Sequence, residues 1–349
     1  YWAAQYNLSE DRRDRYLLNG SLKYKITDWI SAEVNGGADM YTNNQESKLY
    51  GGSPLTNTGR YSLGKDTFIE ENYSMLVTGS KSNILGDFGI SFTAGGNLMK
   101  QRREGLSANA GELEVPDLFS INNGINSPSV GQSFSQRKIN SVFGSFGVDY
   151  HGIVFVDVTG RNDWTSTLSP ENQSFFYPSI NTSFVFSELF NTRPDWWSFR
   201  KIRASYAEVG NDLDPYQLIN TFSIGHDVNG NTTAGTGNTL NNPNLKNELI
   251  KSSEIGFEGR FFKNRLSIDF AWYKSNATNQ LLAIPLDPFS GYNSLRVNAG
   301  NVQNKGIELT INADIIENPE GFSWTANLNY SKNENTIQEL INDVTQFKL

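Results

Sequence analysis

The sequence offers few residues that could catalyse a reaction or hold a metal ion. The 349-residue chain has no cysteine, which excludes a disulfide framework, a thiolate nucleophile and a cysteine metal site. Of its two histidines, His151 is expected in a turn and His226 in a loop, without a second histidine at metal-binding spacing. Asp157 and Asp163 could resemble the carboxylate pair of a glycosidase, but alternation puts both on the charged side of one strand and its rim. No glycine-rich phosphate loop opens a helix. We therefore expect no enzyme, no cofactor and no metal.

Other charged residues recur at every second position of strand-like segments. Side chains alternate between the two faces of a strand, so such charges gather on one face, opposite the apolar residues. A charged face of this kind would line the lumen of a pore. Arg161 and Asp163 are expected to pair at a strand end rather than to bind a ligand. The candidates to face a lumen are Asp157, Arg161, Arg203, Glu254, Glu258, Arg260 and Glu308.

The clearest elements are two strands within residues 254–273, joined by a turn at Lys263 and Asn264. Alternation runs for roughly nine residues in each strand, longer than the five or six of a usual soluble strand. A tilted strand needs about 9–11 residues to cross a bilayer. The apolar stripe predicted to face lipid is Ile255, Phe257, Phe261, Leu266, Ile268, Phe270 and Trp272.

The same pattern predicts about twelve strands along the chain. The fold class is therefore all-β, a transmembrane antiparallel β-barrel, and no apolar run approaches the roughly 18 residues of a membrane helix. Long polar segments, rich in Gly and Asn, are expected as loops at residues 41–66, 100–137 and 210–247, and residues 333–349 show no clear strand. Besides residues 254–273, the expected strands are residues 16–26, 29–40, 71–79, 88–99, 139–150, 153–161, 179–186, 200–209, 305–316 and 324–332.

The connections between these strands alternate between short and long. Outer-membrane barrels have short periplasmic turns and long extracellular loops, so the pattern indicates a barrel rather than a soluble sandwich. The expected loops carry aromatic residues that could stack on sugars. The net charge of −8 argues against nucleic acid as a partner. These loop aromatics are Tyr41, Tyr50, Tyr61, Tyr216 and Tyr292.

Several motifs add a family resemblance. Residues 297–309 read VNAGNVQNKGIEL, residues 242–254 contain NPNLKNE and end in SSE, residues 159–164 read TGRNDW, and residues 203–211 read RASYAEVGN. With the YPS of residues 177–179, this ordered set resembles the SusC/RagA-like TonB-dependent transporters of Gram-negative outer membranes. The chain departs from the family at Ala207, where glycine is usual, and at residues 162–164.

The resemblance implies a 22-stranded barrel of which residues 1–349 form part, as one outer-membrane barrel domain. It also implies a plug domain and a TonB-contacting segment that nothing in this chain matches. Both chain ends, Tyr1-Trp2 and Phe347-Lys348-Leu349, would lie outside the cell, which suggests an interior piece of a larger barrel whose first and last strands do not pair.

The function implied is TonB-driven import of a bulky nutrient, an oligosaccharide or a peptide, across the outer membrane with a SusD-like surface lipoprotein. One alternative is a barrel of the same fold that acts as a structural or docking subunit in an outer-membrane assembly. Another is a soluble sugar-binding β-sandwich, which would need no detergent. Loops of such length are expected to carry the interface with the lipoprotein.

Overall fold

The computed structural model describes residues 7–52, 55–84, 86–189 and 196–340. Nearly all of its regular structure is β-strand, and no helix in this part of the chain is long and apolar enough to cross a membrane. The chain forms two compact units. Unit 1 comprises Tyr1–Lys23, Glu33–Met75 and Asn97–Asn140, and unit 2 comprises Tyr24–Ala32, Leu76–Gly96 and Ser141–Leu349.

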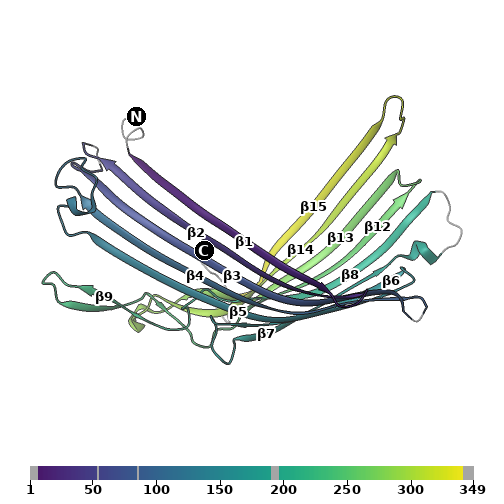
Figure 1. Ribbon diagram of the computed structural model, residues 1–349, viewed down its shortest axis with the longest axis horizontal. Helices are drawn as coiled ribbons and strands as arrows, with labels where there is room; N and C mark the ends of the chain where they lie inside the picture. Colours follow the sequence, from purple (N-terminus) through teal and green to yellow (C-terminus); the bar gives the residue numbers. More distant parts are fainter. Residues whose placement is uncertain (1–6, 53–54, 85, 190–195, 341–349) are drawn as a thin grey trace. The chain divides into compact units, whose positions relative to one another are not determined.

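The strands follow one another through one sheet largely in chain order (Figure 1). In the described residues this sheet has 13 strands, and β11 is only two residues long, which leaves the twelve long strands that the alternation predicts. A second sheet pairs β9 with β10. The strands are β1 Leu8–Lys25, β2 Ile30–Tyr50, β3 Gly59–Ile84, β4 Phe88–Glu112, β5 Ser129–Tyr150, β6 Val154–Thr165, β7 Ser174–Phe184, β8 Trp197–Asn211, β9 Phe222–His226, β10 Thr232–Thr236, β11 Thr239–Leu240, β12 Glu248–Phe261, β13 Leu266–Pro285, β14 Ser294–Ile316 and β15 Trp324–Glu339. Three short 3-10 helices are η1 Ile121–Asn123, η2 Phe186–Leu189 and η3 Pro288–Ser290.

The strands on the side of the expected long loops are longer than predicted. β2 continues to Tyr50 and β3 begins at Gly59, so most of residues 41–66 is strand and not loop. The expected loop at residues 100–137 shrinks to residues 113–128 for the same reason. β15 also extends through residues 333–339, where no strand was expected, and residues 341–349 lie outside the described residues. Beyond the bilayer both faces meet water, so backbone pairing continues without an alternating pattern to mark it.

The pairing of β12 with β13 confirms the predicted faces. Ile255 lies opposite Trp272, Phe257 opposite Phe270, and Phe261 opposite Leu266, so the apolar residues of both strands share one face. The turn between them holds Phe262, Lys263 and Asn264 with positive φ angles of 54°, 56° and 70°. A sharp left-handed turn therefore fixes the register, as the short connection requires.

The strand order has β1 at one end and β14, with its neighbours, at the other. The order begins at β1 and runs to β14, which pairs with β13, with the two-residue β11 and with β15. Among the described strands, β1 and β15 are therefore not neighbours in the sheet.

Small apolar clusters order the connections on the loop side. In unit 1, Tyr61, Ala110 and Leu113 are buried and pack against Phe119 and Ile121. In unit 2 the buried residues are Leu168, Leu213 and Leu245, packed against Phe175, Leu218 and Leu281. These loops therefore have cores of their own and hold defined shapes.

Candidate functional site

The seven charged residues predicted to face a lumen lie on one face of unit 2. One row of directly paired residues crosses β6, β7, β8 and β12 at Asp157, Asn181, Ser205 and Glu254. A second row, two residues along, crosses β8, β12, β13 and β14 at Arg203, Gly256, Ala271 and Glu308. Positions two residues apart on a strand share a face, so Arg161, Glu258 and Arg260 belong to it as well. We refer to it as the charged face.

Arg203 joins three strands at the centre of this face. Its guanidinium donates to the carboxylate of Asp269 at 2.9 and 3.1 Å and to Glu254 at 3.2 Å. Asp269 is on β13, two strands from Arg203, so the side chain must cross β12. It crosses at Gly256, where a Cβ atom would lie 2.5 Å from the Arg203 Nε. Gly256 is therefore the position that allows this bidentate ion pair.

A hollow of about 300 Å³ lies beside Arg203. Its charged lining comprises two cations, Lys201 and Arg203, and two carboxylates, Asp157 and Glu254. The rest of its lining is small or uncharged, namely Asn181, Thr182, Ser183, Ala204 and Ser205. The structure thus brings together three of the seven predicted residues, and the site offers donors and acceptors of both charge signs.

Arg161 belongs to a different cluster, which holds strands together. It donates to Asp163 at 2.8 Å and to the Ser141 hydroxyl at 2.7 Å. Tyr177, directly opposite Arg161, donates its hydroxyl to the same Asp163. Asp163 is only 7% exposed. The expectation that Arg161 and Asp163 pair is confirmed, and this cluster is closed to a ligand by its own hydrogen bonds.

The remaining charged positions are less closely connected to the hollow. Glu258 accepts from Arg260 at 2.9 Å along the same strand. Glu308 lies on β14, opposite Ala271. Neither Glu258, Arg260 nor Glu308 lines the hollow beside Arg203. The structure therefore separates the seven predicted residues into a central group of three and four residues around it.

Three of the five predicted loop aromatics are in strands, which corrects their expected location. Tyr41 is in β2 and stacks on Phe68 at 4.9 Å between ring centroids, with the guanidinium of Arg13 at 4.9 Å. Tyr50 ends the same strand and meets the ring of Phe119 edge-on at 4.8 Å. These rings pack within unit 1, in strands that continue past the length needed to cross a bilayer.

Tyr61 is in β3 and is buried, so it cannot stack on a sugar. Its hydroxyl donates to Glu46 at 2.7 Å. Burial first, and then this hydrogen bond, raise the pKa of Tyr61 to about 12. The hydrogen bonds from Lys48 and Tyr61 lower the pKa of Glu46. Both groups lie on the loop side of the strands, where they stabilise the unit 1 cluster.

The other two predicted aromatics are in connections, as expected. Tyr216 follows β8, is 59% exposed and adopts a φ of 65°. Tyr292 lies between η3 and β14. These two remain candidates for contact with a ligand or a partner.

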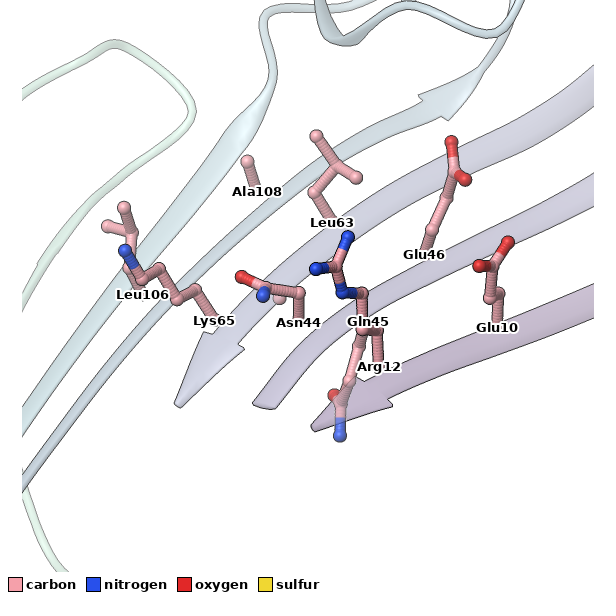
Figure 2. Close-up of a pocket in the computed structure, with 10 residues that line it drawn as sticks. Glu10, Arg12, Asn44, Gln45, Glu46, Leu63, Lys65, Leu106 and Ala108 are labelled. Carbon is pink, nitrogen blue, oxygen red and sulfur yellow. The ribbon is translucent and has the colours of Figure 1, made fainter. Parts of the chain in front are cut away.

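Unit 1 contains a separate pocket of about 520 Å³ that the sequence did not reveal (Figure 2). Figure 2 shows Glu10 and Arg12 from β1, Glu46 from β2 and Lys65 from β3 around it. It holds none of the seven predicted charged residues. Leu63 and Lys65 are two residues apart in β3, so they share one face of that strand, opposite Asp66 and Phe68.

The chemistry of the charged face is that of binding. No group of three or more His, Asp or Glu residues in the described ranges could hold a metal ion. What the hollow supplies is a set of four charges, of which Arg203 and Glu254 lie within hydrogen-bond distance of each other. Sequence reasoning missed Asp269, Lys201 and Asn181 as members of this site. Asp269 and Lys201 lie at alternate positions that belong to the charged face, so their side of the sheet could have been predicted from the sequence. The contact that Arg203 makes across Gly256 could not have been predicted in this way.

Comparison with known proteins agrees with this geometry. Residues 1–347 match the family model described as TonB dependent receptor-like, beta-barrel. "TonB-dependent receptor P3" of Formosa agariphila is 28% identical over 359 residues, which cover 97% of this chain and 34% of that protein. The structure of the RagAB peptide transporter has a TM-score of 0.90 at 20% identity and covers 99% of this chain and 39% of that one. The pyoverdine receptor FpvA of Pseudomonas aeruginosa has a TM-score of 0.57 at 13% identity, with 95% and 46% covered.

This chain thus spans about a third of the length of this curated relative. The all-β barrel fold expected from alternation is confirmed, as is the relationship expected from the motifs. The family comprises transporters and not enzymes, in agreement with the lack of a catalytic constellation in the sequence. The chain belongs to the TonB-dependent receptor-like β-barrel family, and its place is the outer membrane of a Gram-negative bacterium.

Proposed function

We propose that this chain is barrel sequence of a TonB-dependent importer that takes up a bulky nutrient, with the charged face lining the lumen. Of the two cargo classes that the sequence left open, the hollow beside Arg203 favours a peptide. Lys201 and Asp157, which form no ion pair within the described residues, offer one charge of each sign beside the Arg203–Glu254 pair and suit a molecule that carries both a carboxylate and an ammonium group. Sugar sites generally offer aromatic rings for stacking, and no aromatic residue lines this hollow.

The similarity in fold to the RagAB peptide transporter supports the same cargo class. That transporter's name joins two components, and the expected second component here is a SusD-like surface lipoprotein. The loop-side clusters around Leu113 and Leu245 supply ordered surfaces on which such a partner would dock. Contact with the TonB complex would be made through a plug domain, for which no residues of this chain are proposed.

The alternative function is a structural or docking subunit built on the same barrel. Such a subunit would not need the hollow, and replacement of its charges would leave the assembly intact. The Arg203 network alone does not distinguish the two, because it also joins β8, β12 and β13. The test must therefore measure transport and assembly separately.

The experiment uses the full-length receptor in its own host. Uptake of a fluorescent peptide mixture and of labelled oligosaccharides is compared between the wild type, Arg203→Gln, Lys201→Gln and a strain without TonB. Arg260→Gln is the matched control, since Arg260 lies on the charged face but outside the hollow. Receptor level and copurified lipoprotein are measured in each strain.

Transport predicts peptide uptake that is lost without TonB and reduced at least several-fold by Arg203→Gln or Lys201→Gln, with Arg260→Gln near the wild type. Uptake that is unchanged in the strain without TonB would refute import driven by TonB. Energised uptake of oligosaccharides alone would refute the peptide assignment and keep the importer. Uptake that depends neither on TonB nor on these charges, with the lipoprotein still copurified, would support the docking subunit.

A further inference from the structure

The outward face of unit 2, opposite the charged face, bears one lysine on each of four consecutive strands. Each lysine lies just beyond the apolar stripe, on the side of the long connections. In β12, Lys251 lies on the same face as Ile255, and in β13, Lys274 lies on the same face as Trp272. In both strands the lysine is on the side of the apolar residue that is further from the short turn. The four are Lys251 of β12, Lys274 of β13, Lys305 of β14 and Lys332 of β15.

The register shows that these lysines follow a line inclined to the rows of paired residues. Lys251 lies opposite Asn276 of β13, and Lys274 is two residues from Asn276 in the direction of the short turn. Lys305 lies directly opposite Lys274. Lys332 lies opposite Ile307, two residues closer again. The line thus moves four residues, roughly 13 Å, along the strands over three strand spacings, roughly 14 Å.

This displacement corresponds to an angle of about 40° between the lysine line and the rows. Strands of outer-membrane barrels are tilted by about 35–45° from the barrel axis. The short turns shift along the rows in the same sense as the lysines, since β12 and β13 pair as far as Leu266, in the row of Ala313, whereas β14 and β15 pair as far as Ile316. A line inclined to the rows by the tilt angle in this sense lies in the plane of the membrane. The four lysines therefore mark one depth, at the outer boundary of the apolar stripe, where headgroups begin.

Around three of these lysines, the carboxylates of the described residues balance only part of the positive charge. Lys274 and Lys305 are directly opposite one another, an arrangement that destabilises a sheet unless a counter-charge is present. Lys305 has Glu334 at 3.4 Å, but in the described residues no carboxylate lies within salt-bridge distance of Lys274 or Lys332. Lys274, Lys305, Lys332 and Glu334 together therefore leave two positive charges. Lys251 differs, because Glu208 lies 3.4 Å away.

We propose that Lys274, Lys305 and Lys332 bind the phosphate groups of an outer-leaflet glycolipid. The outer leaflet of a Gram-negative outer membrane consists of phosphorylated glycolipid, so an anionic phosphate is available at this depth. Lysine binds phosphate as a point charge on a long stem, and such a stem reaches from the edge of the stripe to a headgroup. The acyl chains would then lie along the stripe below, on Phe270 and Trp272.

The test uses the full-length receptor purified from outer membranes and analysed by native mass spectrometry. Retained glycolipid is measured for the wild type, for Lys274→Gln alone and for the triple Lys274→Gln, Lys305→Gln, Lys332→Gln. Lys246→Gln is the control, since Lys246 is an exposed lysine in the connection before β12. Delipidated samples are then titrated with lipid A, with dephosphorylated lipid A and with inorganic phosphate. Heat-dependent migration on a gel verifies that each variant is folded.

A lysine near an anionic surface contributes about fivefold in affinity, so Lys274→Gln should weaken lipid A binding about fivefold and the triple variant on the order of a hundredfold. Lys246→Gln should bind lipid A with the affinity of the wild type. The wild type should bind dephosphorylated lipid A only weakly. Equal binding of lipid A by the triple variant, or of dephosphorylated lipid A by the wild type, would overturn the proposal. The proposal would also be overturned if inorganic phosphate saturated the site at the concentrations at which lipid A does. If the triple variant does not fold, Lys274→Gln alone decides.

Discussion

Replacement of Ile268 by arginine tests which face of β13 meets lipid. Ile268 lies in the apolar stripe, opposite Gly259 on β12 and Ile311 on β14. An arginine there would place a guanidinium among acyl chains. At Thr310, opposite Asp269, the same arginine would enter the charged face and meet a carboxylate.

The cost follows from depth. With roughly 3.3 Å of rise per residue and a strand tilt of about 40°, each residue spans about 2.5 Å of membrane thickness. Ile268 is then about 5 Å from the level of Leu266 and about 15 Å from that of Lys274. Arginine on the lipid face costs about 2–4 kcal/mol at the midplane and about 0–1 kcal/mol near the interface. We expect about 2 kcal/mol for Ile268→Arg and less than about 1 kcal/mol for Thr310→Arg.

The free energy of unfolding is measured by guanidinium titration of the full-length receptor in lipid vesicles, under conditions where folding is reversible. Both variants add the same side chain at neighbouring strand positions, so the difference isolates the face. A small cost for Ile268→Arg together with a cost of several kcal/mol for Thr310→Arg would refute the assignment of faces.

Three further predictions concern the site, the loops and the orientation. In Gly256→Ala, the added methyl group should displace the Arg203 side chain from Asp269. Peptide uptake should then fall at least several-fold at an unchanged receptor level, and uptake equal to the wild type would show that this ion pair does not shape the site. Leu245→Ala removes a fully buried side chain and should destabilise the loop-side cluster of unit 2 by about 2–5 kcal/mol, seen as faster amide exchange in residues 212–247, and unchanged exchange there would contradict a packed cluster. Trypsin added to intact cells should cut within residues 212–247, unless a partner covers them, and should spare Lys263; cleavage at Lys263 alone would reverse the orientation.

The sequence predicted the strands well where one face meets lipid. In β12 and β13 the alternation from Ile255 to Trp272 located both strands, their turn and their faces, because the bilayer demands an apolar side chain at every second position. It failed at residues 41–50 and 333–339, where both faces are polar. There the strands are held by backbone pairing, which leaves no periodic trace in the side chains.

The site was predictable in part for a related reason. Alternation placed Asp157, Arg203 and Glu254 on one face, and the structure brings them to one hollow. It could not show that Arg203 binds Asp269, because that contact depends on the register of three strands and on a glycine between them. Tyr61 was misplaced because a buried loop-side cluster has the same polar sequence surroundings as an exposed loop.

We expect the charged face to line the lumen and the apolar stripe to meet lipid. The most direct measurement is electron paramagnetic resonance of single spin labels at residues 266–274 of the full-length receptor in vesicles, with oxygen as the lipid-soluble relaxant and a nickel chelate as the water-soluble one. We predict that accessibility to oxygen peaks at Ile268 and Phe270 and falls at Asp269 and Ala271, while accessibility to the nickel chelate shows the opposite phase. High oxygen accessibility at Asp269 with high nickel accessibility at Ile268 would contradict this assignment of the two faces.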